Sequence, residues 1–276
     1  MKRIGLIAGS GRFPILFAEE AKRSGADVVA LGIRGVTDPA LDRIVSRIAY
    51  FKLGQIEKPL RFLKEFGITQ AVMAGKVAHA SLFGGVLPDL RAVKLLARLK
   101  DKRTDTILQA VAQEFAKEGI ELLPSSTYLS HCLARSGVLT TRAPSPAESA
   151  DIALGWKAAK ALAGLDIGQS VVIQGGAIIA VEAMEGTDSA IARAAELARL
   201  HGREPALTVV KVAKPRQDVR FDLPVVGLET LKTLERCGVS ALALEAGKTL
   251  IFDMEDFLRG AQKLKVAVTG IEDSAS

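Results

Sequence analysis

The sequence predicts an α/β fold of two domains, an N-terminal Rossmann-like parallel sheet followed by a C-terminal α/β domain with a mixed sheet. The chain has 276 residues, which exceeds one average domain and falls short of three. Hydrophobic residues make up 49% of it but aromatic residues only 5%, so aliphatic side chains must fill the core, as is typical of sheets covered by helices. Short apolar runs also alternate with helical patterns, which favours parallel strands.

We expect the N-terminal domain to span residues 1–135. An apolar strand at 4–8 leads through a glycine turn into a helix at 15–24, with Pro14 in its first turn. The later elements follow from apolar runs and helical periodicity. They are strands at 28–33, 70–74 and 121–123, and helices at 59–66, 90–99 and 106–117.

Residues 136–149, SGVLTTRAPSPAES, are rich in Ser, Thr and Pro and are expected to form a linker. The C-terminal domain is then 150–276. Two strands joined by Gly175-Gly176 predict a hairpin. The expected elements are helices at 150–163, 189–200 and from about 228, and strands at 170–174, 177–182, 206–212, 241–244, 249–252 and 266–269.

Composition limits the classes of function. A net charge of +6 suits an anionic ligand or an anionic membrane surface, and is too small and dispersed to predict nucleic-acid binding. The N-terminus turns polar after a few apolar residues and no apolar run approaches the ~18 residues of a membrane span, so we expect a cytoplasmic protein.

The sequence lacks the motifs of several common enzyme classes. No serine-hydrolase, P-loop or zincin motif occurs, and the three histidines do not have the spacing of a zinc site or a catalytic triad. They are His79, His131 and His201.

The segment 211–227, KVAKPRQDVRFDLPVVG, has the composition of a polyphosphate site. A pyrophosphate must be neutralised by cations, and Asp222 among them should stay ionised and able to hold Mg²⁺ or orient water. The cations are Lys211, Lys214, Arg216 and Arg220. The alternative is the solvated face of an edge strand. An apolar run at 206–212 precedes the segment, and the ends of strands are where α/β sheets bind ligands.

Two glycine turns predict a second group of contacts at a sheet edge. Gly9, Ser10 and Gly11 could direct backbone N–H groups at a phosphate, or could form a tight turn needed only for geometry. Lys76, after Gly75, should lie near the same edge or be solvated. Pro14 and Arg34 break the dinucleotide fingerprint, which argues against NAD and leaves NADP open.

The segment 182–188, EAMEGTD, leads from a strand into a helix. Thr187 or Asp188 is expected to cap that helix. Capping does not explain the other acids, so Glu182 and Asp188 are second candidates, after Asp222, to coordinate Mg²⁺.

Five motifs in order resemble the LpxI-type UDP-2,3-diacylglucosamine pyrophosphatases, and the resemblance runs from the first strand to the last. The motifs are GLIAGSGRFP at the N-terminus, AGKV at 74–77, LDIGQSVV at 165–172, AVEAMEGTD at 180–188 and KPRQDVRFDLPVVG at 214–227. The resemblance implies a Mg²⁺-dependent enzyme of lipid A biosynthesis. Such an enzyme hydrolyses UDP-2,3-diacylglucosamine to UMP and 2,3-diacylglucosamine 1-phosphate (lipid X), with water attacking the β-phosphorus.

The resemblance also implies roles for residues of this chain. The essential aspartate of the family's DLPxxG motif matches Asp222, and we expect the substrate in a cleft between the domains. Charge on the phosphoryl oxygens would be stabilised by Lys211, Lys214 and Arg220. The expected substrate contacts are Gly9, Ser10, Gly11, Lys76, Gly186 and Thr187.

Expected partners are the UDP-linked diacylated amino sugar, transient contact with the inner face of a membrane, and further copies of the chain in a homo-oligomer. An NADP-dependent oxidoreductase and a non-catalytic nucleotide or lipid carrier are the alternatives.

Overall fold

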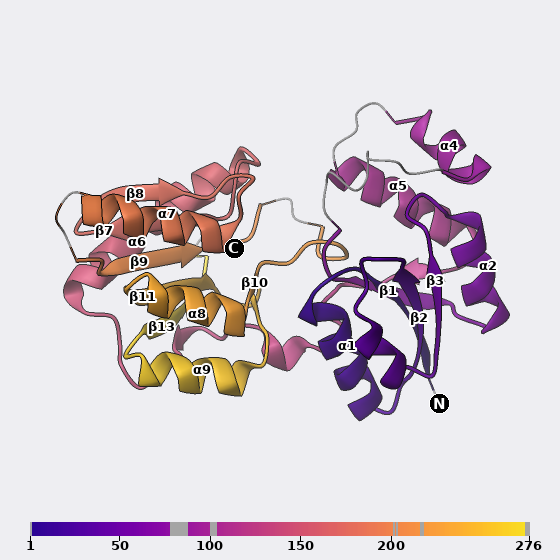
Figure 1. Ribbon diagram of the computed structural model, residues 1–276, viewed down its shortest axis with the longest axis horizontal. Coiled ribbons are helices and arrows are strands. Elements are labelled where there is room, and N and C mark those ends of the chain that lie inside the picture. The colour runs from indigo at the N-terminus through magenta and orange to yellow at the C-terminus, as the bar shows by residue number, and fades with distance from the viewer. Residues whose placement is uncertain are drawn as a thin grey trace. The chain divides into compact units, whose positions relative to one another are not determined.

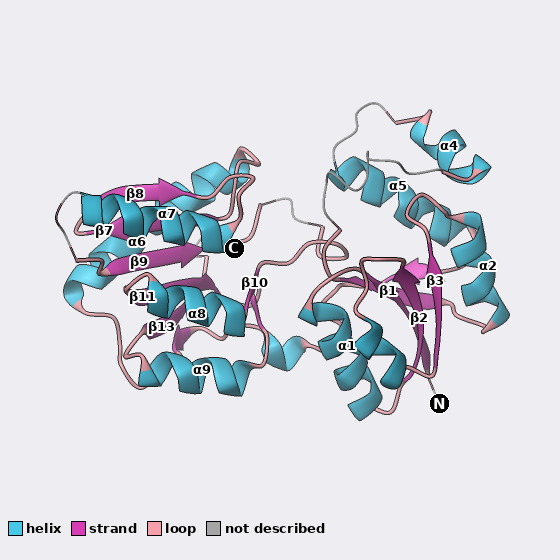
Figure 2. Ribbon diagram, viewed as in Figure 1, coloured by secondary structure: helices cyan, strands magenta, loops and turns pink. Residues whose placement is uncertain are grey.

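The computed structural model describes residues 2–77, 88–99, 104–200, 202, 204–215 and 218–273 (Figures 1 and 2). The chain divides into two compact units. Unit 1 comprises Met1–Ser130 together with Asp218–Asp222, and unit 2 comprises His131–Gln217 together with Leu223–Ser276. Three residues discussed in the sequence analysis lie outside the described residues, namely Arg216, His79 and His201.

Unit 1 is built on a five-stranded sheet of order β3-β2-β1-β4-β5. Every pairing in it is parallel, which confirms the predicted Rossmann-like sheet. The strands are β1 (Arg3–Ala8), β2 (Asp27–Ile33), β3 (Arg47–Phe51), β4 (Gln70–Ala74) and β5 (Glu121–Leu122). The edge strand β3 is an addition to the prediction. Because β1 and β4 are neighbours, the turns that follow them meet at one sheet edge.

Helices cover both faces of this sheet, as Figure 2 shows for α1 and α2. Leu63, Leu95 and Phe115 from three helices pack with Val29 and Ala71 in one core cluster. The helices are α1 (Arg12–Arg23), the 3-10 helix η1 (Pro39–Arg43), α2 (Glu57–Glu65), α4 (Leu90–Leu96) and α5 (Thr104–Lys117). Pro14 lies in the first turn of α1, as expected.

Unit 2 has a six-stranded sheet of order β6-β13-β11-β9-β7-β8. The three central strands pair in parallel while β6, β7 and β8 pair antiparallel, which confirms the predicted mixed sheet. Its strands are β6 (Gly137–Val138), β7 (Ser170–Gln174), β8 (Ala177–Val181), β9 (Leu207–Lys211), β11 (Val239–Glu245) and β13 (Ala267–Ile271). Glycine conformations with positive φ at Gly175 and Gly176 close the β7–β8 hairpin.

One predicted strand belongs elsewhere. Residues 249–252 were expected in the mixed sheet, but β12 (Leu250–Ile251) pairs in parallel with β10 (Val225–Val226) in a separate two-stranded sheet. The prediction was wrong because an apolar run identifies a strand without identifying the strand that pairs with it.

Helices cover the mixed sheet on both faces because neighbouring strand residues point to opposite sides. Val210 packs on the face of α6 (Pro146–Gly164). Val209 packs on the opposite face, which is covered by α7 (Thr187–Leu200), α8 (Leu228–Arg236) and α9 (Met254–Lys263). Figure 2 shows these three helices on the near face.

The stretch 136–149, expected as a linker, lies within unit 2. Its β6 pairs with β13, and Ser145 caps α6 in a capping box with Glu148. Ser and Pro residues in this stretch therefore start a helix and do not mark a linker, because Ser145 caps α6 and Pro146 lies in its first turn. Among the described residues, none of the helices combines the length and apolarity that a bilayer crossing requires.

Candidate functional site

Two predicted turns of unit 1 join at the carboxyl ends of β1 and β4. Gly9 N donates to Ala74 O at 2.8 Å, and Ser10 N donates to Lys76 O at 2.8 Å. Lys76 N in turn donates to Ser10 O at 3.1 Å. The glycine turn and Lys76 therefore share one sheet edge.

Close backbone packing explains two of the glycines there. A Cβ on Gly9 would lie 2.7 Å from Lys76 O, and a Cβ on Gly75, whose φ is +95°, would lie 2.7 Å from Ser10 O. The amides of Gly9 and Ser10 are already used within the fold. The requirement for a tight turn thus explains glycine at position 9. Contact of this turn with substrate stays a prediction. Gly11, with φ +88°, caps α1 and has open space where a Cβ would be.

A short segment of the predicted polyphosphate site packs with unit 1, although its neighbours on both sides belong to unit 2. We call these residues, Asp218–Asp222, the strap. Ser125, fully buried, donates its amide to Val219 O at 2.8 Å. Its hydroxyl lies 2.8 Å from Arg220 O and 2.9 Å from Met73 O, so one proton is shared between the two carbonyls. Phe221 packs against the Phe115 core cluster.

The strap is therefore anchored near the carboxyl end of β4, because Met73 directly precedes Ala74, whose carbonyl accepts from Gly9 N. Within the strap, the amides of Phe221 and Asp222 both donate to Asp218 O, at 3.0 and 3.2 Å. This turn fixes the backbone of Asp222. The segment 211–227 is divided between the units, since Lys211 and Lys214 belong to unit 2.

Arg220 is engaged inside the strap. Its Nε and Nη2 donate to the two oxygens of Asp218 at 2.8 and 2.6 Å, and its guanidinium lies 4.9 Å from the Phe221 ring centroid. The hydrogen bonds between the two side chains lower the pKa of Asp218 and raise that of Arg220. The sequence argument placed the cations around Asp222 and did not consider Asp218 as a partner for Arg220.

A partly buried polar cluster lies at the end of β9 in unit 2. Lys211, with 6% of its surface exposed, donates from Nζ to Thr187 Oγ1 at 2.6 Å. Thr187 donates to Glu182 Oε1 at 2.9 Å and lies 3.3 Å from Ser170 Oγ. We call these four residues the Lys211 cluster. A buried ammonium needs such partners, because burying an unpaired charge is costly.

The other candidates of unit 2 are more exposed or differently paired. Lys214 Nζ lies 2.7 Å from Asp166 Oδ1. Asp188 is exposed in the first turn of α7, and Gly186 has φ +85° just before it.

Sequence reasoning did not find Glu245, a fully buried carboxylate at the end of β11. It accepts from Ala213 N at 2.8 Å, from Lys160 Nζ at 3.2 Å and from Lys248 Nζ at 2.8 Å. Its position at a strand end was the available signal.

Carboxylates do not gather into a metal cage in the part of the chain that the structure describes. Within it, no three His, Cys, Asp or Glu residues lie close enough to hold a metal together. Asp222 belongs to unit 1, whereas Glu182 and Asp188 belong to unit 2. Glu182 Oε2 also accepts from Gln169 N at 3.4 Å. The donor set fits Mg²⁺ held by one or two carboxylates together with substrate phosphates, a common arrangement for that ion.

Comparisons with known proteins agree from one end of the chain to the other. Residues 3–132 match the LpxI N-terminal domain and residues 135–269 match the LpxI C-terminal domain. The chain is 34% identical over 278 residues to UDP-2,3-diacylglucosamine pyrophosphatase LpxI of Caulobacter vibrioides, covering 99% of this chain and 98% of that protein.

A solved structure, phosphoribosylglycinamide synthetase from Anaerococcus prevotii, is 13% identical with a TM-score of 0.27, over 72% of this chain and 42% of that one. That likeness is too low to indicate architecture or function. The two family models and the full-length relative show that the chain belongs to the LpxI family.

Proposed function

We propose that this protein hydrolyses the pyrophosphate of UDP-2,3-diacylglucosamine, giving UMP and 2,3-diacylglucosamine 1-phosphate. The observation that carries the proposal is the relative of that name, which aligns over 98% of its own length and 99% of this chain. The structure adds support, because the DLPVVG motif begins at Asp222, on a strap anchored at a sheet edge where ligands of α/β proteins usually bind.

In the proposed reaction the oxygen of water forms a bond to the β-phosphorus. The bond from that phosphorus to the bridging oxygen breaks, and the bridging oxygen leaves with UMP. The Asp222 carboxylate accepts a hydrogen bond from the attacking water and so orients it, and the released proton passes to solvent. Charge on the phosphoryl oxygens is stabilised by Lys211, Lys214 and Arg220. Their bonds to Thr187, Asp166 and Asp218 hold these cations in place beforehand.

We propose Mg²⁺ as the cofactor, with Asp222 as a protein ligand and the substrate's diphosphate as the others. Mg²⁺ would neutralise charge on the diphosphate. Glu182 and Asp188 stay predictions as ligands. Glu182 is the weaker of them as a metal ligand, because both of its oxygens already accept hydrogen bonds.

Product analysis in ¹⁸O-labelled water tests the reaction. With Mg²⁺ present we expect unlabelled UMP, and one ¹⁸O in the sugar 1-phosphate, because attack at the β-phosphorus leaves the bridging oxygen on UMP. With EDTA in place of Mg²⁺ both products should be lost. Label in UMP would contradict attack at the β-phosphorus.

Two alternatives predict different results, the first in the same experiment and the second in a thermal-shift measurement. A carrier would retain the UDP-lipid and release no UMP with Mg²⁺ present. An NADP-dependent oxidoreductase would show a thermal shift with NADPH, which the hydrolase should not. The cleft between domains, the homo-oligomer and the cytoplasmic location stay predictions.

A further inference from the structure

The helix α4 of unit 1 carries an exposed apolar stripe. Leu90 is 75% exposed, Val93 49% and Leu96 42%, at a spacing that places them on one face of the helix. The opposite face, with Ala92 and Leu95, is buried in the core. Large apolar side chains that gather on a surface and are bordered by charges mark an interaction site.

The orientation of this stripe is fixed by polar contacts. Asp89 Oδ1 accepts from Ala92 N at 2.9 Å, and Oδ2 accepts from Ile56 N at 2.7 Å and Glu57 N at 2.9 Å. One carboxylate thus joins the starts of α4 and α2. Arg91 ties α4 to α5 through Glu114 Oε2 at 2.8 Å. The stripe therefore faces outward because the rest of the helix is held.

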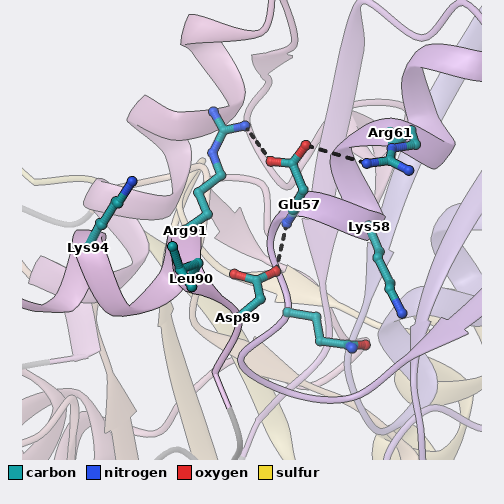
Figure 3. A pocket seen from close by; sticks show the side chains of 8 residues that line it. Glu57, Lys58, Arg61, Asp89, Leu90, Arg91 and Lys94 are labelled. Atoms are coloured by element: carbon teal, nitrogen blue, oxygen red, sulfur yellow. Dashed lines mark hydrogen bonds and ion pairs between the residues drawn. The ribbon is translucent and has the colours of Figure 1, made fainter.

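Positive charge borders the stripe. A hollow of about 540 Å³ between α2 and α4 (Figure 3) is lined by four cations and two acids. Both acids are engaged, Asp89 by the amides above and Glu57 by Arg91 at 3.1 Å and Arg61 at 4.0 Å. The structure gives no ion pair between Lys58 or Lys94 and any described acid. The cations are Lys58, Arg61, Arg91 and Lys94.

We propose that Leu90, Val93, Leu96, Lys58 and Lys94 form a docking surface for an anionic phospholipid bilayer, which we call the α4 surface. Apolar side chains of a short helix enter the boundary between headgroups and acyl chains, while lysines at its border attract lipid phosphates. A single exposed helix of seven residues suits shallow insertion better than a stable protein interface, which needs far more area. The choice of lipid rests on the proposed function, since a diacylated substrate resides in a membrane.

Co-sedimentation with vesicles tests this surface in the full-length protein. Wild type should bind phosphatidylglycerol vesicles, bind neutral phosphatidylcholine vesicles at least about tenfold more weakly, and lose binding as salt rises. The Leu90→Ser/Val93→Ser variant and the Lys58→Glu/Lys94→Glu variant should each lower affinity for the anionic vesicles about tenfold or more. Matched controls in unit 2 are Met184→Ser, 95% exposed, and Lys232→Glu/Lys263→Glu.

Further measurements separate this proposal from the proposed hydrolase. The α4-surface variants should release UMP from a soluble short-chain substrate within about twofold of wild type, since they lack no group proposed to contact phosphate. An Asp222→Asn variant should bind vesicles as wild type does. Wild-type vesicle binding by both α4-surface variants would overturn the proposal. So would self-association of the wild type that Leu90→Ser/Val93→Ser abolishes, because the surface would then belong to a second copy.

Discussion

The two units place predicted site residues at equivalent positions, the carboxyl ends of parallel strands, but secure them differently. In unit 2 the Lys211 cluster is held by its own side chains, each bonded to the next in a partly buried setting. In unit 1 the strap is held through the backbone of Val219 and Arg220 and through the Phe221 ring. Substitutions in the Lys211 cluster should therefore change stability and activity together, whereas Asp222 can be changed without removing these anchors.

Among the variants that test how each group of residues is held in place, Lys211→Met should have the largest effect. The substitution leaves the partly buried Thr187 hydroxyl without the Lys211 donor, so we expect a loss of about 1–3 kcal/mol in unfolding free energy. Loss of a phosphate-stabilising cation should also lower kcat/KM about 100-fold. Denaturant unfolding and UMP release measure the two effects, with Lys232→Met as an exposed control. Unchanged stability would show that the cluster is not structural.

Gly9→Ala probes the close approach of the two turns in unit 1. The new Cβ would meet Lys76 O at 2.7 Å, and such overpacking costs about 1–3 kcal/mol. Gly67→Ala, just after α2, meets no atom within 4 Å and loses stability only through its φ of +66°, by about 1 kcal/mol. Thermal unfolding compares the two variants. Equal losses would mean that contact with Lys76 is not what requires glycine at position 9.

Ser125→Ala should loosen the strap while leaving its chemistry intact. Two partly buried carbonyls, of Met73 and Arg220, lose a shared donor, which should cost about 1 kcal/mol. Because Ser125 acts only by positioning Asp222, we expect kcat to fall about tenfold with KM nearly unchanged. Ser125→Thr keeps the hydroxyl and should restore part of the rate. A change confined to KM would contradict a positioning role.

The smallest effect concerns the ion pair of the strap. Hydrogen bonding to Arg220 lowers the pKa of Asp218 below its unfolded value, so the stabilisation is present above the unfolded pKa and is lost as pH falls through the folded one. A double-mutant cycle of Asp218→Asn and Arg220→Gln should give a coupling of about 0.5 kcal/mol at neutral pH, since the pair is partly exposed. The coupling should vanish once Asp218 is protonated. A coupling that persists in acid would contradict the ionic origin.

Local signals predicted much of the fold. The glycine turn before α1 and the Gly175-Gly176 hairpin were predicted because both depend on conformations that glycine adopts easily. The edge strand β3 was missed, since none of its residues is fully buried. Helix α9 was missed as well. Its Gly260 resembles a helix breaker in sequence, but in the fold it leaves room for Leu231, whose Cδ2 would lie 2.3 Å from a Cβ at this position.

The site was predicted in part. The charge pattern and the family resemblance pointed to the segment that contains Asp222. They also pointed to Lys211, Thr187 and Glu182, which the structure joins in one cluster. Membership of the strap in unit 1 could not be predicted. It depends on Ser125, 95 residues away from Arg220 in the chain, and on packing of Phe221 against the core cluster of unit 1 that contains Phe115. Such long-range packing leaves no local pattern.

Single-turnover release of UMP by Asp222→Asn, at saturating Mg²⁺ and substrate, tests the central claim that the carboxylate on the strap carries the chemistry. We predict a rate at least about 1,000-fold below wild type, because the change removes an interaction made mainly in the transition state. The variant should still fold cooperatively, since the Ser125 anchor of the strap remains. Asp256→Asn, an exposed carboxylate on α9, is the matched control and should behave as wild type. A rate for Asp222→Asn within tenfold of wild type would contradict the claim.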